Sequence, residues 1–169
     1  MTKVVLLSDS HNYLDEAIFR HLEGADEIWH AGDIGELSIT DRLGEFAKVR
    51  AVYGNVDGHK VREAWPEDAI FEIEGLKVYM THIGGYPGRY NPRVRMIIDR
   101  EHLGLFISGH SHIVRAMRDP KRGLLHLNPG AVGIEGFHNV RTLMKFEVKE
   151  SKVVNLNLVE LGKRGRLPK

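Results

Sequence analysis

The sequence predicts an α/β fold in which two β-sheets pack together and helices cover the outside. Short apolar runs alternate with amphipathic helical segments in the first third of the chain, which is the order of a βαβαβ unit with parallel strands and right-handed crossovers. The last third is richer in paired strand-like segments. With 169 residues, of which 42% are hydrophobic, the chain suits one compact domain, which we place at residues 1–161.

The βαβαβ unit begins with the wholly apolar run Val4 to Leu7, which suits a central strand buried on both faces. A helix follows, with Asn12 as the expected N-cap and Gly24 as the stop signal. A second strand, a second helix with one apolar face and a third strand complete the unit. The second strand is expected at 26–31 and the third at 49–53. The apolar face of the second helix consists of Ile39, Leu43 and Phe46.

Hairpins and one further helix account for the rest of the chain. Glu74-Gly75 is typical of a tight turn between two strands. Asn91 and Pro92 supply an N-cap and a first-turn proline for the helix. We expect the basic segment 162–169 to be a flexible tail. The remaining strands are expected at 69–74, 76–80, 105–108, 113–118, 124–127, 142–148 and 153–161.

Composition excludes several classes of protein and site. The chain has ten histidines and no cysteine, so disulfides and thiolate metal sites are impossible and any metal must be held by nitrogen and oxygen. A formal net charge of +1 gives no strong signal for a nucleic-acid or membrane partner. Asp9 follows the first apolar run too soon for a signal peptide, and no apolar run reaches transmembrane length. We therefore expect a cytoplasmic protein.

Metal-ligating residue types follow five of the predicted strands. The clearest case is the run 107–112, in which a short apolar segment ends in a glycine and two histidines one residue apart. Loops beyond the carboxyl ends of strands converge in an open α/β sheet, so these residues are candidates for one site. Seven ligands of mixed nitrogen and oxygen chemistry are too many for one ion with an open position, and they suit two ions that share a carboxylate. The candidates are Asp9, His11, Asp33, Asn55, His82, His110 and His112.

Five short motifs, in order along the chain, carry a resemblance to a known family. They are Asp9-Ser10-His11, Gly32-Asp33, Gly54-Asn55-Val56-Asp57, Thr81-His82 and Gly109-His110-Ser111-His112. Together they closely resemble the calcineurin-like metallophosphoesterase superfamily. The short chain and Asn128-Pro129-Gly130 are similar to its small YfcE-type phosphodiesterase branch. The resemblance spans residues 4–161 and implies a four-layer αββα sandwich of two mixed sheets flanked by helices, the metallo-dependent phosphatase fold.

The resemblance also implies a role for each candidate residue. By this resemblance Asp9, His11 and His112 hold a first divalent ion, Asn55, His82 and His110 hold a second, and Asp33 bridges them. Manganese is the expected metal, with nickel, iron, zinc and cobalt as alternatives. Two such ions can share a hydroxide for in-line attack at phosphorus, so the expected nucleophile is this hydroxide and not a side chain. The expected substrate is a small phosphodiester, with Asp33, Asn55 and His82 as the catalytic residues.

Two positions depart from the family pattern. Many members carry a histidine directly after the Gly-Asn pair, where it helps the leaving group depart, and here that position is Val56. Valine cannot donate a proton, so the sequence favours leaving groups that need little help, and YfcE-type members commonly lack this histidine too. The Thr-His-Gly-His motif of that branch has Gly84 in place of its second histidine. Arg89 and Tyr90 could replace its contact with the substrate, and His59 could serve as a proton donor.

Two other functions remain open from the sequence. The same fold occurs in the Vps29 retromer subunit, a protein-interaction scaffold that this chain resembles in size. Intact ligand residues at all seven positions favour an enzyme over such a scaffold. A phosphomonoesterase is disfavoured mainly by Val56. The oligomeric state is not determined by the sequence, and a homo-oligomer is possible.

Overall fold

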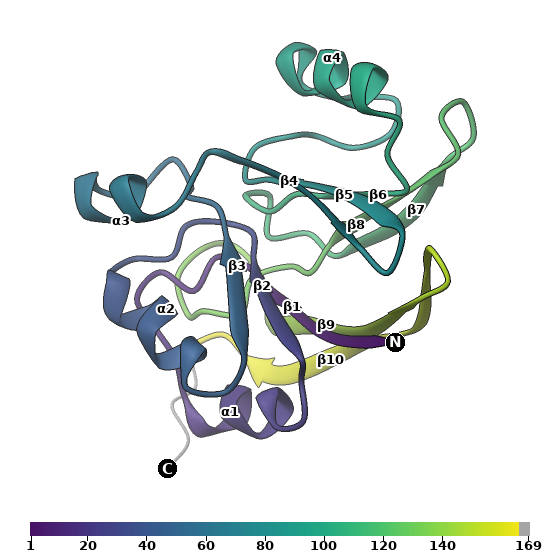
Figure 1. The fold of residues 1–169 in the computed structure, drawn as a ribbon. Helices are drawn as coiled ribbons and strands as arrows, with labels where there is room; N and C mark the ends of the chain where they lie inside the picture. Colours follow the sequence, from purple (N-terminus) through teal and green to yellow (C-terminus); the bar gives the residue numbers. More distant parts are fainter. Residues whose placement is uncertain (166–169) are drawn as a thin grey trace.

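The computed structural model of the protein describes residues 1–165, which form two five-stranded sheets and four helices (Figure 1). The helices are α1 (Glu16–Leu22), α2 (Leu37–Gly44), α3 (His59–Ala64) and α4 (Pro92–Glu101). The strands are β1 (Thr2–Leu7), β2 (Glu27–His30), β3 (Lys48–Ala51), β4 (Asp68–Ile73), β5 (Leu76–Thr81), β6 (Leu105–Ile107), β7 (Arg115–Asp119), β8 (Leu124–Asn128), β9 (Val140–Lys149) and β10 (Lys152–Lys163).

The first sheet has the strand order β10-β9-β1-β2-β3. β1, β2 and β3 are parallel, as the βαβαβ order predicted. The C-terminal hairpin returns to this sheet, because β9 pairs antiparallel with β1 and β10 pairs antiparallel with β9. β10 ends at Lys163, two residues beyond the predicted end of the strand. Residues 166–169 of the predicted tail lie outside the described residues.

The first helix begins later than the sequence suggested. Its N-cap is Asp15, whose side chain accepts a hydrogen bond from the Ile18 amide. The prediction that Asn12 is the N-cap was wrong: Asn12 has a φ of 66°, and its amide donates to the Ile34 carbonyl over 2.9 Å. A contact between two loops therefore determines the backbone at Asn12. The short helix α3 was not predicted, and Val61 is its buried residue, so it leaves almost no apolar pattern.

The second sheet has the strand order β4-β5-β6-β8-β7. β5, β6 and β8 are parallel neighbours. The edge strand β4 pairs antiparallel with β5, and the edge strand β7 pairs antiparallel with β8. The predicted turn between β4 and β5 is confirmed, with φ values of 48° at Glu74 and 78° at Gly75. The predicted start of α4 is confirmed too, because the Asn91 side chain accepts the Arg93 amide and Pro92 lies in the first turn.

Three apolar clusters fill the three interfaces of a four-layer αββα sandwich, which confirms the expected fold (Figure 1). Trp29 and Phe146 of the first sheet pack between the sheets with Met80 and Ile107 of the second. α1, α2 and α3 cover the outer face of the first sheet, and α4 covers the outer face of the second. Within residues 1–165, no helix is long and apolar enough to cross a membrane.

Candidate metal centre

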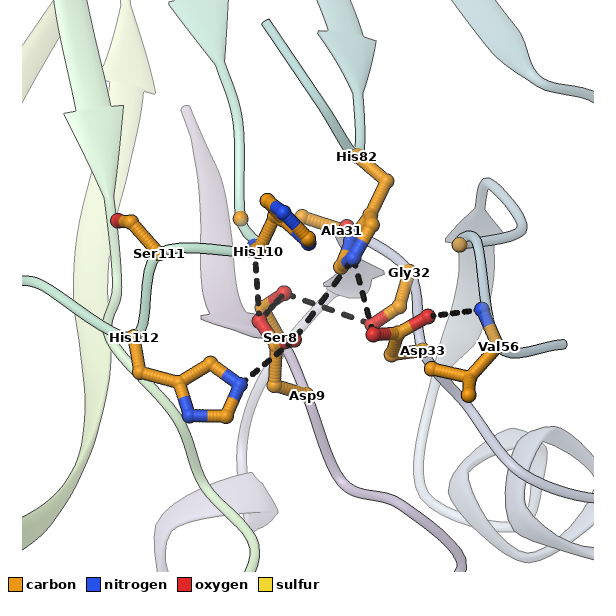
Figure 2. A network of polar contacts seen from close by, with 12 residues as sticks. Ser8, Asp9, Ala31, Gly32, Asp33, Val56, His82, His110, Ser111 and His112 are labelled. Carbon is orange, nitrogen blue, oxygen red and sulfur yellow. Dashed lines mark hydrogen bonds and ion pairs between the residues drawn. The ribbon is translucent and has the colours of Figure 1, made fainter. Parts of the chain in front are cut away.

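Five loops meet where β1, β2, β3, β5 and β6 end, and they carry all seven predicted residues. Backbone hydrogen bonds join these loops: the Asp9 amide donates to Gly32 over 2.9 Å, and the Gly109 amide donates to His82 over 3.0 Å. Six of the predicted side chains form two groups, and within each group the potential ligand atoms lie within 4.8 Å of one another. Figure 2 shows Asp9, Asp33, His82, His110 and His112 of these side chains. The first group is Asp9, His11 and His112, and the second is Asp33, His82 and His110.

The first group converges on one carboxylate oxygen of Asp9. His112 Nε2 lies 3.1 Å from Asp9 Oδ1, and His11 Nε2 lies 3.7 Å from the same oxygen. Metal bonds of about 2.1 Å at octahedral to tetrahedral angles place two ligand atoms roughly 3.0–3.4 Å apart. The Asp9–His112 distance matches this spacing, and His11 is slightly farther away.

The second group adjoins the first through Asp33. His82 Nε2 lies 3.1 Å from Asp33 Oδ2, and His11 Nε2 of the first group lies 3.7 Å from the same oxygen. His82 Nε2 is also 3.8 Å from Asp9 Oδ1. Asp33 Oδ2 therefore lies close to a histidine of each group, as Asp9 Oδ1 also does, and a carboxylate shared by two ions requires such a position.

Asn55, the seventh predicted residue, borders the second group. Asn55 and His82 line the same hollow, which has a volume of about 280 Å³. The next amide along the chain, that of Val56, donates to Asp33 Oδ1 over 3.0 Å (Figure 2). The Asn55 loop is thereby attached to the carboxylate that faces both groups.

The backbone turns sharply at most of these residues. Asp9, His11, Asp33, His110 and His112 all have left-handed φ values, between 44° and 68°. Such conformations are uncommon outside glycine and cluster at functional sites. Close packing accompanies them, because a Cβ atom added at Gly54 would overlap the Asp33 carboxylate. A side chain at that position would displace the candidate ligand.

Hydrogen bonding fixes the ring of His82. Its Nδ1 lies 2.7 Å from the Ala31 carbonyl oxygen, which can only accept, so Nδ1 carries a proton and donates it. Nε2 then presents its lone pair to the centre. This buried Nε2 makes no hydrogen bond of good geometry among residues 1–165, and its near polar neighbour is Asp33 Oδ2 at 3.1 Å. An imidazole held through one nitrogen, with the other free, is the usual arrangement of a metal ligand.

His138 fixes the ring of His112 in the same way. His138 Nε2 donates to the Gly133 carbonyl over 2.8 Å, so the Nδ1 of a neutral His138 has a free lone pair. His112 Nδ1 lies 3.1 Å from that lone pair and donates to it. His112 Nε2 is therefore left to face Asp9 Oδ1 with its own lone pair. This role could not be predicted from the sequence, because His138 is a lone histidine outside every motif.

Electrostatics at the centre favour added positive charge. Burial by itself would raise the pKa of the Asp9 carboxyl, but contacts with His11 and His112 hold that pKa far below its usual range. Burial by itself would lower the pKa of His82, but the Asp33 and Asp9 carboxylates raise it above the usual value. Two buried carboxylates thus attract cations to the points where the imidazoles converge.

Comparison with known proteins identifies the family. The profile of the calcineurin-like phosphoesterase superfamily domain matches residues 2–151. The chain belongs to this superfamily. A probable metallophosphoesterase of Methanocaldococcus jannaschii is 30% identical over 92% of this chain and 80% of its own. One from Methanothermobacter thermautotrophicus is 32% identical over 75% of this chain and 74% of its own.

Solved structures show the same metallophosphoesterase fold. A novel archaeal phosphodiesterase superimposes with a TM-score of 0.73 at 21% identity, covering 94% of this chain and 99% of the other. Wild-type Vps29 of Entamoeba histolytica, complexed with Zn²⁺, superimposes with a TM-score of 0.72 at 18% identity, covering 95% of this chain and 99% of the other. At these identities the likeness concerns the fold alone.

Metallophosphoesterases use divalent metal ions, and the residues present fit such ions. The donors are carboxylate oxygens and imidazole nitrogens, which suit first-row divalent metals. His82 Nε2 is buried beside the Asp33 and Asp9 carboxylates without a hydrogen bond of good geometry among the described residues, and these carboxylates favour a positive charge at this point. A bound cation would satisfy both features.

Several other side chains of this metallophosphoesterase hold the ligand loops in place. Ser8 Oγ donates to Asp9 Oδ2 over 2.6 Å. The Asn128 side-chain amide donates to the Gly109 carbonyl over 3.0 Å, which fixes the loop that carries His110 and His112. Asn128 begins the motif that indicated the YfcE-type branch, and this contact gives the motif a structural role.

Asp57 joins two of the ligand loops through hydrogen bonds, and His30 is a buried histidine at the end of β2. Asp57 accepts the amides of Ile34, Gly35 and Gly54 at 2.8–3.0 Å, and so ties the Asp33 loop to the Asn55 loop. His30 is fully buried, and this burial lowers its pKa to about 4, so its imidazole is neutral.

The two substitutes considered for missing family contacts lie elsewhere. Tyr90 donates to Asp119 over 2.8 Å, and with Arg89 it lines a hollow beside the turn between β7 and β8. The His59 ring is on the exposed face of α3, where it pairs with Glu63 over 2.8 Å. The structure therefore gives neither a replacement phosphate contact from Arg89 and Tyr90 nor a proton donor from His59.

Proposed function

We propose that the protein is a phosphodiesterase with a dinuclear metal centre that hydrolyses a small phosphodiester. The observation that carries this proposal is the position of Asp33 Oδ2, which lies 3.1 Å from His82 Nε2 in one ligand group and 3.7 Å from His11 Nε2 in the other. One carboxylate oxygen between two adjoining ligand groups is the arrangement required for two ions that act on one phosphate.

The ligand assignment follows the two groups. Asp9, His11 and His112 hold one ion, His82, His110 and Asn55 hold the other, and Asp33 is shared. When bound, such ions lower the pKa of a water molecule and neutralise charge on the phosphate. The protein orients the imidazoles through the carbonyl of Ala31 and the ring of His138. We propose manganese as the resident metal, with nickel, iron, zinc and cobalt as alternatives, because mixed nitrogen and oxygen donors suit this group of divalent ions.

The rim of the centre supports a diester as the substrate. Val56, which follows Asn55, is 63% exposed, and Ile83, which follows His82, is 40% exposed. Neither can donate a proton to a leaving group, so leaving groups that depart as stable anions are favoured. A diester carries a second organic group that a monoester lacks, and apolar side chains at the rim can pack against such a group. The similar archaeal structure is named a phosphodiesterase, in agreement with this proposal.

Hydrolysis of p-nitrophenyl esters by chelator-stripped protein tests the proposal. Manganese, nickel, zinc and magnesium are added back separately, and the diester bis-(p-nitrophenyl) phosphate is compared with the monoester p-nitrophenyl phosphate. We expect metal-dependent turnover that favours the diester. Preference for the monoester would replace the phosphodiesterase with a phosphomonoesterase. Binding of two metal equivalents without turnover of either ester would instead support a scaffold of the Vps29 type.

A further inference from the structure

The hollow beside the second ligand group contains two arginines. It measures about 280 Å³, and Asn55 and His82 line it together with Arg62 from α3 and Arg93 from α4. The hollow thus extends from the candidate metal centre to two cationic side chains that lie outside the family motifs. Their partners determine which of the two charges is available to a ligand.

The charge of Arg93 is already neutralised. Its guanidinium makes two contacts with the Asp68 carboxylate, at 2.6 and 3.3 Å, and lies 3.2 Å from Glu67. Glu67, the carboxylate on the wall of the hollow, is therefore occupied by Arg93. A pair of carboxylates around one guanidinium leaves no excess positive charge at this wall.

The charge of Arg62 is not neutralised. Its Nε donates to the Asp57 carbonyl over 2.7 Å, and Nη2 donates to the Asn55 carbonyl over 3.2 Å. Its guanidinium also lies over the Tyr53 ring, 4.7 Å from the centroid. Within residues 1–165, no carboxylate lies within 4.0 Å of Arg62, and Nη1 makes no hydrogen bond. Contacts with two carbonyl groups and an aromatic ring hold the Arg62 guanidinium in place without neutralising its charge.

We propose that Arg62 forms a subsite for a phosphate group that the substrate carries in addition to the scissile diester. The inference rests on the proposed function, in which the metal centre neutralises the scissile phosphate. A substituent of the diester that enters the hollow then meets an oriented guanidinium with free donors. Guanidinium matches phosphate in geometry as well as in charge. The substrate class is thus a small phosphodiester with a second, terminal phosphate.

A matched pair of substrates tests this subsite. Thymidine 5′-(p-nitrophenyl phosphate) and its 3′-phosphorylated form release the same leaving group from the same bond and differ only in the added phosphate. We take the ratio of kcat/KM for the 3′-phosphorylated substrate to kcat/KM for the unphosphorylated one. Damage to Asn55 or to the metal centre affects both values and cancels in this ratio. We expect a ratio of about 10 to 100 for the native protein, since a charge-assisted hydrogen bond contributes this much. Arg62→Gln should reduce the ratio to about 1.

Lys60→Gln is the matched control, because it removes the same charge from the same helix at a residue that does not line this hollow. This control should keep the ratio of the native protein. Arg62→Lys should give an intermediate ratio, because it keeps the charge and loses the fork. A native ratio near 1, or a ratio that survives Arg62→Gln, would overturn the proposal.

Equilibrium binding separates failure of the subsite from failure of the proposed function. Calorimetry with manganese-loaded protein compares thymidine 5′-phosphate with thymidine 3′,5′-bisphosphate, and neither measurement needs turnover. We expect tighter binding of the bisphosphate, and we expect Arg62→Gln to abolish the difference. If no diester is hydrolysed but the difference in affinity still depends on Arg62, the proposed phosphate subsite is supported and the proposed phosphodiesterase activity is contradicted. Equal affinities in the native protein would overturn the subsite.

Discussion

Each candidate imidazole is prepared for a metal by what its other nitrogen contacts. His82 donates to a backbone carbonyl, whereas His112 donates to a second histidine, His138, which is itself held by the Gly133 carbonyl. A backbone carbonyl cannot be removed by mutation, but His138 can be. His138 therefore offers direct access to the orientation of one candidate ligand.

His138→Leu should weaken the first metal site. Leucine removes the acceptor for His112 Nδ1, so the ring is free to rotate and to bind a proton at either nitrogen. We expect a loss of about 10-fold to 100-fold in affinity for one of the two ions, the usual effect of removing such a partner. Competition with a chromophoric chelator measures both affinities.

His138→Gln is the control for this experiment, because its side-chain oxygen can still accept from His112 Nδ1. It should lose less affinity than His138→Leu. Two sites of native affinity in His138→Leu would show that His112 needs no partner. Melting of both metal-free variants checks that they are folded.

Asp33→Asn should strongly reduce turnover while keeping the fold. The amide can still accept the Val56 N–H, but it lacks the charge that two neighbouring cations require. We expect kcat/KM for bis-(p-nitrophenyl) phosphate to fall by about 100-fold or more. Asp99→Asn, a surface carboxylate paired with Arg122, is the matched control and should retain activity. Retained turnover in metal-loaded Asp33→Asn would exclude a bridging role for Asp33.

Elements whose pattern is local could be predicted, and elements defined by contacts between loops could not. The apolar run of β1, the Glu74-Gly75 turn and the Asn91-Pro92 helix start each contain their signal within a few residues. Asn12 shows the opposite case, because its conformation depends on the Ile34 carbonyl of another loop. The same limit applies to the turn after β3, where Asp57 gave only a turn signal in the sequence.

Asp57→Ala should destabilise the two loops that carry Asp33 and Asn55. The substitution leaves three backbone amides without their acceptor, at Ile34, Gly35 and Gly54. We expect the free energy of unfolding to fall by about 2–4 kcal/mol, since each lost bond to a charged acceptor costs about 1.5–3 kcal/mol and water recovers part of it. Urea denaturation of the metal-free protein measures this change.

Asp57→Asn tests whether the acceptor itself matters. Its side-chain oxygen can keep one or two of the three bonds, so we expect a smaller loss than for Asp57→Ala. Equal stability of the native protein and Asp57→Ala would show that these loops are held by other contacts.

At the scale of the whole molecule, the candidate centre is built from both sheets. Asp9, Asp33 and Asn55 follow strands of the first sheet, whereas His82, His110 and His112 follow strands of the second. The ordered motifs were enough to name these residues from the sequence. Arg62 and His138 could not be found in that way, because each is a single residue whose partners are set by the packing of distant segments.

Because the ligands come from both sheets, metal binding should stabilise the whole fold. An ion that binds only the folded state at 100 times its Kd adds about 2.7 kcal/mol, so two ions add about 5 kcal/mol. For a domain of this size this corresponds to a rise in Tm of roughly 10–20 °C. Scanning calorimetry of chelator-treated protein across a manganese titration measures the rise. His82→Asn, which disables the second group, should retain about half of it, whereas the exposed control His59→Asn should retain all of it. A Tm that does not depend on manganese would mean that the two ligand groups do not bind it in the folded protein.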